Sequence, residues 1–147
     1  LADSQLTSDG YLTITRQWKK GDQVCLHLDM QPRLVRAHEQ VESERGCIVV
    51  ERGPLLYCAE HPDNDFNLSA FIVNQKPRFT LGTTEIAGTT VTTLSTQAQS
   101  LAFDDQGRLV TADQSLTLIP YYAWCHRGRG QMRVWLRQNL AGATAGN

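Results

Sequence analysis

Apolar and polar residues alternate with a period of two along most of this chain, and no stretch sustains the helical period of 3.6. Side chains of a β-strand point to opposite faces in turn, so this alternation is typical of half-buried strands. Residues 47–51 and 55–60 are apolar enough for central strands, and Pro54 between them, which cannot donate to a ladder, indicates a bend. The pattern therefore predicts an all-β fold.

Further strands are predicted where alternation, or a sequence rich in threonine, valine and isoleucine, is bounded by turn-forming residues. They cover residues 11–16, 24–30, 33–38, 71–74, 77–81, 85–87, 89–94, 115–119 and 131–137. Many short strands separated by regular turn signals are typical of sandwiches and barrels. We expect an antiparallel, jelly-roll-like β-sandwich over residues 1–140, with little or no helix, and a disordered tail at 141–147.

Composition excludes several classes of partner. Hydrophobic residues make up 41% of the 147 positions and charged residues 20%, which is ordinary for a globular domain. The formal net charge is −1, whereas nucleic-acid binding needs a basic surplus, so we expect no nucleic-acid partner. No apolar run approaches the roughly 20 residues that cross a bilayer, so no membrane partner is expected either.

The four cysteines have neither a CxxC pair nor the spacing of a zinc ribbon; they are Cys25, Cys47, Cys58 and Cys125. Free buried thiols of a reduced compartment are the favoured interpretation, and this points to the cytoplasm. Disulfides are one alternative. The other is a metal site, since zinc takes four such donors, and its candidate ligands are Cys58, His61, Cys125 and His126.

Catalytic residues are not indicated. Three carboxylate pairs could in principle act on a glycosidic bond: Glu42 with Glu44, Asp63 with Asp65, and Asp104 with Asp105. All three lie in polar loops, where such pairs are usually hydrated. There is no GxSxG elbow and no glycine-rich phosphate loop, and a Ser, His and Asp triad stays open on sequence alone.

Residues 116–136 combine adjacent aromatics with several arginines. Three aromatics follow Pro120, and residues 127–130 form a turn back into the last predicted strand, which favours a buried aromatic hairpin. The alternatives are sugar stacking and packing on another domain. The candidate contacts are Tyr121, Tyr122, Trp124 and Arg127.

The end of the chain is basic, since no acidic residue follows Asp113. On a strand, Arg133 and Arg137 would share one face because side chains alternate. A solvated or acid-paired face is the simpler interpretation, and contact with an anion or a partner is the alternative.

Three motifs in order, at residues 10–30, 51–60 and 116–136, resemble the C-terminal, non-catalytic part of bacterial beta-L-arabinofuranosidase-like enzymes of glycoside hydrolase family 127. The matching positions are Arg52, Gly53, Pro54 and Tyr57 in the second motif, and Pro120, Tyr121, Trp124, Arg127 and Gly128 in the third. Cys125 and His126 depart from the small residue and asparagine expected there.

The resemblance implies that the active site belongs to an N-terminal helical barrel with a cysteine nucleophile and a zinc ion. This chain has no adjacent cysteine pair, so no catalytic residue, metal ligand or cofactor site is carried over, and zinc is expected only in the catalytic domain. The resemblance also implies β-sandwich domains packed on the barrel. Residues 1–37 are then candidate closing strands of a preceding sandwich.

The function expected on this basis is that of a non-catalytic accessory β-sandwich, which supports the N-terminal catalytic domain and contributes to a homodimer. The alternative is a carbohydrate-binding module with an aromatic platform around Trp124, whose partner would be an arabinose-containing oligosaccharide.

Overall fold

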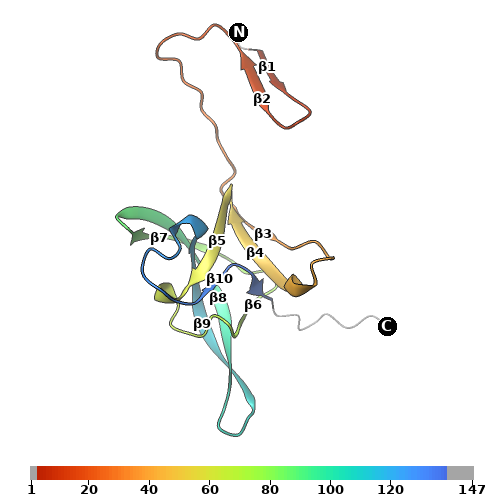
Figure 1. The fold of residues 1–147 in the computed structure, drawn as a ribbon, viewed down its shortest axis with the longest axis vertical. Helices are drawn as coiled ribbons and strands as arrows, with labels where there is room; N and C mark the ends of the chain where they lie inside the picture. The colour runs from red at the N-terminus through yellow and green to blue at the C-terminus, as the bar shows by residue number, and fades with distance from the viewer. Residues whose placement is uncertain (1–2, 139–147) are drawn as a thin grey trace.

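The computed structural model describes residues 3–138, and these form an all-β structure of antiparallel strands (Figure 1). The fold class predicted from the alternation is therefore confirmed. Helical structure in this part of the chain is limited to three short 3-10 turns: η1 (Glu42–Glu44), η2 (His61–Asp63) and η3 (Tyr121–Ala123). The tail predicted at 141–147 lies outside the described residues.

The chain begins with a small hairpin of β1 (Asp3–Leu6) and β2 (Leu12–Thr15). Figure 1 shows it standing apart from the main body, connected by a long extended segment. The strand predicted at 24–30 is wrong, because residues 22–30 adopt no regular structure. Alternation makes a segment suitable for a sheet edge, but a strand also needs a ladder partner. Within residues 3–138 none pairs with this segment.

The main sheet has the order β11-β4-β5-β9-β8-β6, with β3, β7 and β10 attached to β4, β8 and β5. The strands are β3 (Pro32–Val35), β4 (Cys47–Arg52), β5 (Leu55–Glu60), β6 (Phe71–Val73), β7 (Thr80–Ile86), β8 (Thr89–Phe103), β9 (Leu109–Pro120), β10 (Met132–Arg133) and β11 (Leu136–Arg137). Both predicted central strands are confirmed as β4 and β5, with the predicted bend between them.

β4 and β5 pair only near their turn, where Glu51 faces Leu56, and then diverge. Residues 132–137 enter the opening between them: β10 pairs with β5 and β11 pairs with β4. Figure 1 shows this divergence as an inverted V. The predicted hairpin between 115–119 and 131–137 is therefore wrong. β9 and β10 both pair with β5 instead. Ala59 pairs with Leu118 of β9 and with Arg133 of β10, so the two strands lie on opposite edges of β5.

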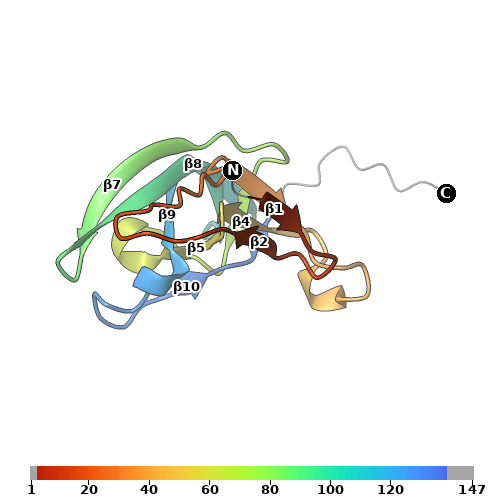
Figure 2. The same ribbon diagram turned by 90° about the horizontal axis from the view of Figure 1, so that it is seen from above.

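The sheet curls until its two ends meet. A single parallel bridge joins Val73, in β6, to Gln138, just after β11. The enclosed core receives side chains from both walls, and its fully buried members include Ile48, Tyr57, Leu94, Leu116 and Leu118. Seen from above, β7 and β8 lie along one side and β10 along the other, with β5 and β9 between them (Figure 2).

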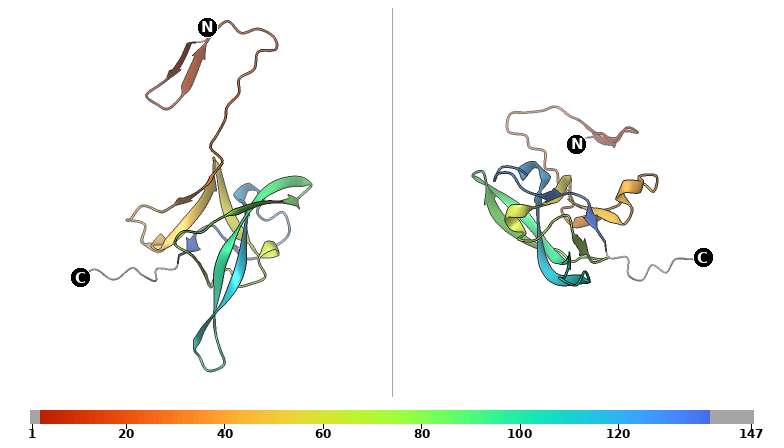
Figure 3. Two further views of the ribbon diagram at one scale, coloured as in Figure 1. Left: turned by 180° about the vertical axis from the view of Figure 1, so that it is seen from behind. Right: turned by 60° about the horizontal axis from the view of Figure 1, so that its bottom comes forward.

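The middle of the chain forms longer strands than its glycines suggested. Gly82 does not interrupt β7, because a Cβ there would lie 2.8 Å from Thr93 Oγ1 on the paired strand, and glycine leaves that space. Gly88, with a φ of +76°, does form the predicted turn between β7 and β8. The far end of the β8–β9 hairpin projects from the body (Figure 3).

Candidate functional site

The loop after β9 carries the aromatic residues singled out in the sequence. Tyr121, Tyr122 and Trp124 are 41%, 58% and 36% exposed, so the prediction of a buried aromatic hairpin is wrong. In this loop Ala123 faces the core, where it is 4% exposed and packs with Cys58 and Ile119. The 3-10 turn at Pro120 rotates the three larger rings outward.

Two of these rings are stacked on each other. The centroids of Tyr121 and Trp124 lie 5.9 Å apart, with 22° between the planes. Their backbones are linked as well, since the Trp124 N–H donates to the Tyr121 carbonyl. The result is a preorganised aromatic surface, in which each stacked ring has one face covered by the other.

Arg127 fastens this loop to the body of the domain. Its guanidinium donates to Glu60 Oε2 at 2.6 Å and to Asp63 Oδ1 at 2.8 Å. The Glu60 residue is 1% exposed, and its other oxygen accepts the backbone N–H of Cys125 at 3.0 Å. The hydrogen bond to Asp63 raises the pKa of Arg127, burial opposes it, and the hydrogen bond to Glu60 adds to the rise. Arg127 is thus occupied within the domain.

A buried asparagine supports the residues that hold Arg127. Asn64 is 2% exposed, and its amide nitrogen donates to the carbonyls of Glu60 and Thr117 at 2.8 and 2.9 Å. Its oxygen accepts the Thr117 N–H at 2.8 Å. Neither Glu60 nor Asn64 was predicted from the sequence. For Glu60 the sequence did hold an indication, because it lies two residues after the buried Cys58 on β5 and so points to the same face of the strand.

Cysteine burial follows strand membership. All four thiols are free; Cys47 and Cys58 are buried, as predicted, whereas Cys25 and Cys125 are exposed. Cys25 belongs to the segment without a strand partner, which explains its exposure. Burial raises the pKa of Cys58 to about 12, and nearby Glu60 and Asp63 act in the same direction.

The possible metal donors of the chain lie apart from one another. Within residues 3–138, no three His, Cys, Asp or Glu side chains come together in a way that could hold a metal ion. The candidate set of Cys58, His61, Cys125 and His126 is divided between a buried thiol and exposed side chains. These residues do not fit a zinc site.

The carboxylate pairs considered for catalysis contribute to local structure. Asp63 binds Arg127, and Glu42 binds Arg45 at 3.1 Å. Asp104 accepts hydrogen bonds from the backbone and side chain of Arg108, and these lower the pKa of Asp104.

A second exposed apolar surface lies in the N-terminal part. Val24, Leu26 and Leu28 are 61%, 76% and 51% exposed, and they alternate along the extended segment. Tyr11 and Trp18 are also exposed. In the part of the chain that is described, no helix has the length and apolarity required to span a membrane.

These features define a class: an antiparallel β-domain in which a buried ion pair holds the aromatic loop, and which presents two apolar surfaces outward. Comparison with known families gives the particular one. Residues 32–137 match the glycoside hydrolase family 127 C-terminal domain, and residues 2–30 match the beta-L-arabinofuranosidase GH127 middle domain. The chain belongs to glycoside hydrolase family 127, which confirms the resemblance seen in its motifs.

Individual relatives agree with this assignment. A non-reducing end beta-L-arabinofuranosidase of Bifidobacterium longum subsp. longum is 30% identical over 142 residues, covering 88% of this chain. Among solved structures, the GH127 beta-arabinofuranosidase BT3674 is 45% identical, with a TM-score of 0.80 over 95% of this chain. Ara127N-Se, a GH127 beta-L-arabinofuranosidase from Geobacillus stearothermophilus T6, is 27% identical, with a TM-score of 0.71 over 91%. The chain spans 22% of the length of each.

Proposed function

We propose that this chain acts as an accessory domain of a beta-L-arabinofuranosidase-like protein, where it stabilises the neighbouring domains and has no turnover of its own. One observation carries the proposal: Val24, Leu26 and Leu28 alternate along an extended segment, point their side chains into solvent and have no strand partner within residues 3–138. The segment lies in the stretch that matches the middle domain.

Leaving these apolar side chains in water forgoes the stability that their burial would give. Fully burying a Val or Leu side chain stabilises a protein by about 1.5–3 kcal/mol. An extended segment with alternating apolar residues and unpaired backbone groups is suited to the edge of another sheet. Residues 2–30 then complete a preceding β-domain, while residues 32–137 form their own core. The exposed Tyr121 and Trp124 provide a second contact for the catalytic part.

The test compares the same substitutions in two settings. Leu26→Ser with Leu28→Ser is introduced into the 147-residue chain and into a protein extended to the length of its relatives, beside Leu81→Ser on β7 as a control. We expect the melting temperature of the short chain to be unchanged by either substitution. The melting temperature of the long protein should fall by several degrees with the Leu26→Ser, Leu28→Ser pair and stay unchanged with Leu81→Ser. Equal melting temperatures for all long variants would refute the proposal.

Dimerisation is part of the proposed accessory role, because an unpaired strand edge can also pair with a second copy. Light scattering after size exclusion measures this in both proteins. A dimer of the short chain that becomes monomeric with the Leu26→Ser, Leu28→Ser change, while the long protein stays monomeric throughout, would assign this edge to the preceding domain alone.

Absence of turnover is tested directly with an aryl beta-L-arabinofuranoside, with and without added zinc. We expect no release above the rate in buffer. Release that depends on zinc and on this chain would overturn the assignment.

Sugar binding by the aromatic loop is a second candidate, and the exposure of Tyr121, Tyr122 and Trp124 favours it. Two features weigh against it: the stack covers one face of Trp124, and Arg127 is occupied by Glu60 and Asp63. Calorimetry with arabino-oligosaccharides decides the matter. Saturable heat that disappears in a folded Trp124→Ala variant would favour the binding module.

A further inference from the structure

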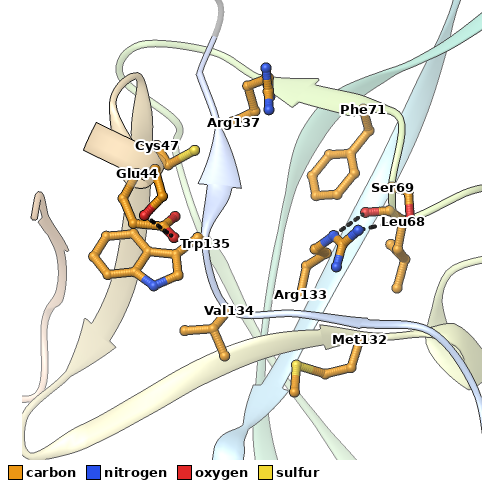
Figure 4. A pocket seen from close by; sticks show the side chains of 11 residues that line it. Glu44, Cys47, Leu68, Ser69, Phe71, Met132, Arg133, Val134, Trp135 and Arg137 are labelled. Carbon is orange, nitrogen blue, oxygen red and sulfur yellow. Dashed lines mark hydrogen bonds between the residues drawn. The ribbon is translucent and has the colours of Figure 1, made fainter. Parts of the chain in front are cut away.

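A pocket of about 420 Å³ lies between residues 132–137, η1 with the start of β4, and the loop that leads into β6. Figure 4 shows Trp135 near Glu44 and Cys47 on one side, and Arg133 near Leu68 and Ser69 on the other. The volume falls within the range of about 300–1,000 Å³ that is usual for small-molecule sites. It is separate from the aromatic loop, whose rings do not line it.

Arg133 is held in place at the pocket wall. Its Nε donates to the Leu68 carbonyl at 3.1 Å, and a terminal nitrogen donates to Ser69 Oγ at 2.8 Å. A guanidinium has five N–H groups, so donors remain for a ligand. The side chain is therefore positioned without being neutralised, since neither partner carries a charge.

Arg137 supplies a second positive charge. It faces Cys47 across the β11–β4 ladder. Burial raises the pKa of the Cys47 thiol, and the positive charge of Arg137 opposes that rise. Within residues 3–138 it forms no ion pair. Glu44 is the acidic side chain of the described lining and accepts a hydrogen bond from Ser43 Oγ. The described lining thus contains two arginines and one carboxylate.

Trp135 adds an aromatic wall. The bend at Val134 and Trp135 separates β10 from β11, and both residues line the pocket with the two arginines. An indole face packs well against the C–H face of a sugar ring, whereas Ser43 and Ser69 can exchange hydrogen bonds with hydroxyl groups.

We propose that this pocket binds a carboxylate-bearing sugar, such as a uronate. The guanidinium groups of Arg137 and Arg133 receive the carboxylate, because their planar N–H donors match its two oxygens, and Trp135 receives the ring. The choice of a sugar among carboxylates rests on the proposed role within a glycoside hydrolase. The excess of positive charge makes an acidic sugar a better match than a neutral one.

The experiment uses the indole N–H signals of the ¹⁵N-labelled 147-residue chain. Trp18, Trp124 and Trp135 each contribute one signal, assigned with Trp→Phe variants. The chain is titrated with D-glucuronate and D-galacturonate, and in parallel with D-glucose, D-galactose, acetate and inorganic phosphate. We expect saturable movement of the Trp135 signal with a uronate and far weaker effects from the other four compounds.

Variants test the donors. Arg137→Gln should weaken uronate binding by about tenfold or more, which is the usual effect of losing a charge-assisted hydrogen bond, while Arg137→Lys keeps part of the affinity. Arg129→Gln removes the same charge from a residue outside the pocket and should change nothing. Spectral dispersion verifies that each variant is folded.

Several results would overturn the proposal: no saturable shift with either uronate, unchanged affinity in Arg137→Gln, or phosphate binding as tightly as the uronates, which would indicate a general anion site. If the Trp124 signal alone moved, sugar would bind at the aromatic loop and not at this pocket. Failure here leaves the accessory role intact, because that role is measured by unfolding of the long protein rather than by ligand binding.

Discussion

Arg127 donates a 2.6 Å hydrogen bond to Glu60, whose carboxylate is buried at the end of a central strand. This pair joins two segments that are 67 residues apart in the chain. It also fixes the orientation of the stacked Tyr121 and Trp124, because Glu60 accepts the Cys125 N–H in the same loop. The exposed aromatic surface therefore depends on a buried ion pair.

Breaking that pair should be costly. Arg127→Gln leaves the Glu60 carboxylate buried without its cation, and we expect a loss of about 3 kcal/mol in the free energy of unfolding. Arg45→Gln breaks an exposed pair with Glu42 and should cost about 0.5 kcal/mol or less. Urea denaturation measures both. Similar values for the two variants would show that the buried pair contributes little.

Asn64 should be equally sensitive to substitution. Asn64→Ala leaves the part-buried N–H and C=O of Thr117 without their side-chain partner, so a loss of about 2–4 kcal/mol is expected. Asn74→Ala changes an exposed asparagine and should remain within about 0.5 kcal/mol of the parent. Thermal unfolding of the two variants side by side gives the comparison, and a stable Asn64→Ala protein would contradict the bonding described.

Thiol reactivity should divide the cysteines by burial. In the native protein at pH 8, a thiol reagent such as DTNB should label Cys25 and Cys125 rapidly, and Cys47 and Cys58 only after unfolding. Mass spectrometry of the labelled peptides identifies each site. Rapid labelling of Cys58 in the native state would show that β5 opens more readily than its burial indicates.

The buried Cys58 thiol should make the folded protein less stable as pH rises above 9. Its pKa is raised from the ordinary 9.0 to about 12 in the folded state, so its contribution is full below pH 9 and is lost as pH rises from 9 towards 12. Cys58→Ala should be less stable than the parent at pH 8 but should lose stability less steeply above pH 9. Parallel slopes of the two pH curves would contradict this.

Gly53 should report on the contact between the N-terminal segment and the β4–β5 turn. It has a φ of +58°, and a Cβ there would overlap Met30 Sδ. Gly107 has a φ of +74° with nothing within 4 Å, so Gly107→Ala isolates the cost of backbone strain, about 1–2 kcal/mol. Gly53→Ala should cost more, and Met30→Ala should recover the difference. If Gly53→Ala and Gly107→Ala lower the free energy of unfolding equally, the Met30 side chain moves aside without a measurable cost.

Most strands could be predicted because a strand that is buried on one or both faces has a recognisable local pattern of apolar and polar residues. β4 and β5 were predicted with their bend, and Gly88 with its turn. Strand 24–30 was predicted wrongly from the same signal, since alternation reports only on the faces of a segment and not on the presence of a neighbour. Family membership was also evident, because the motifs around Pro54 and Pro120 retain their order.

The sequence by itself determined the all-β class, the two central strands and the family. The tertiary structure decided that Tyr121 and Trp124 are exposed, that Arg127 pairs with Glu60, and that Arg133, Trp135 and Arg137 line a pocket with Cys47 and Glu44. The reason is physical: alternation and turn chemistry act over a few residues, whereas pairing of β10 and β11 with β5 and β4 brings together groups more than 60 residues apart, among them Arg127 and the buried Glu60.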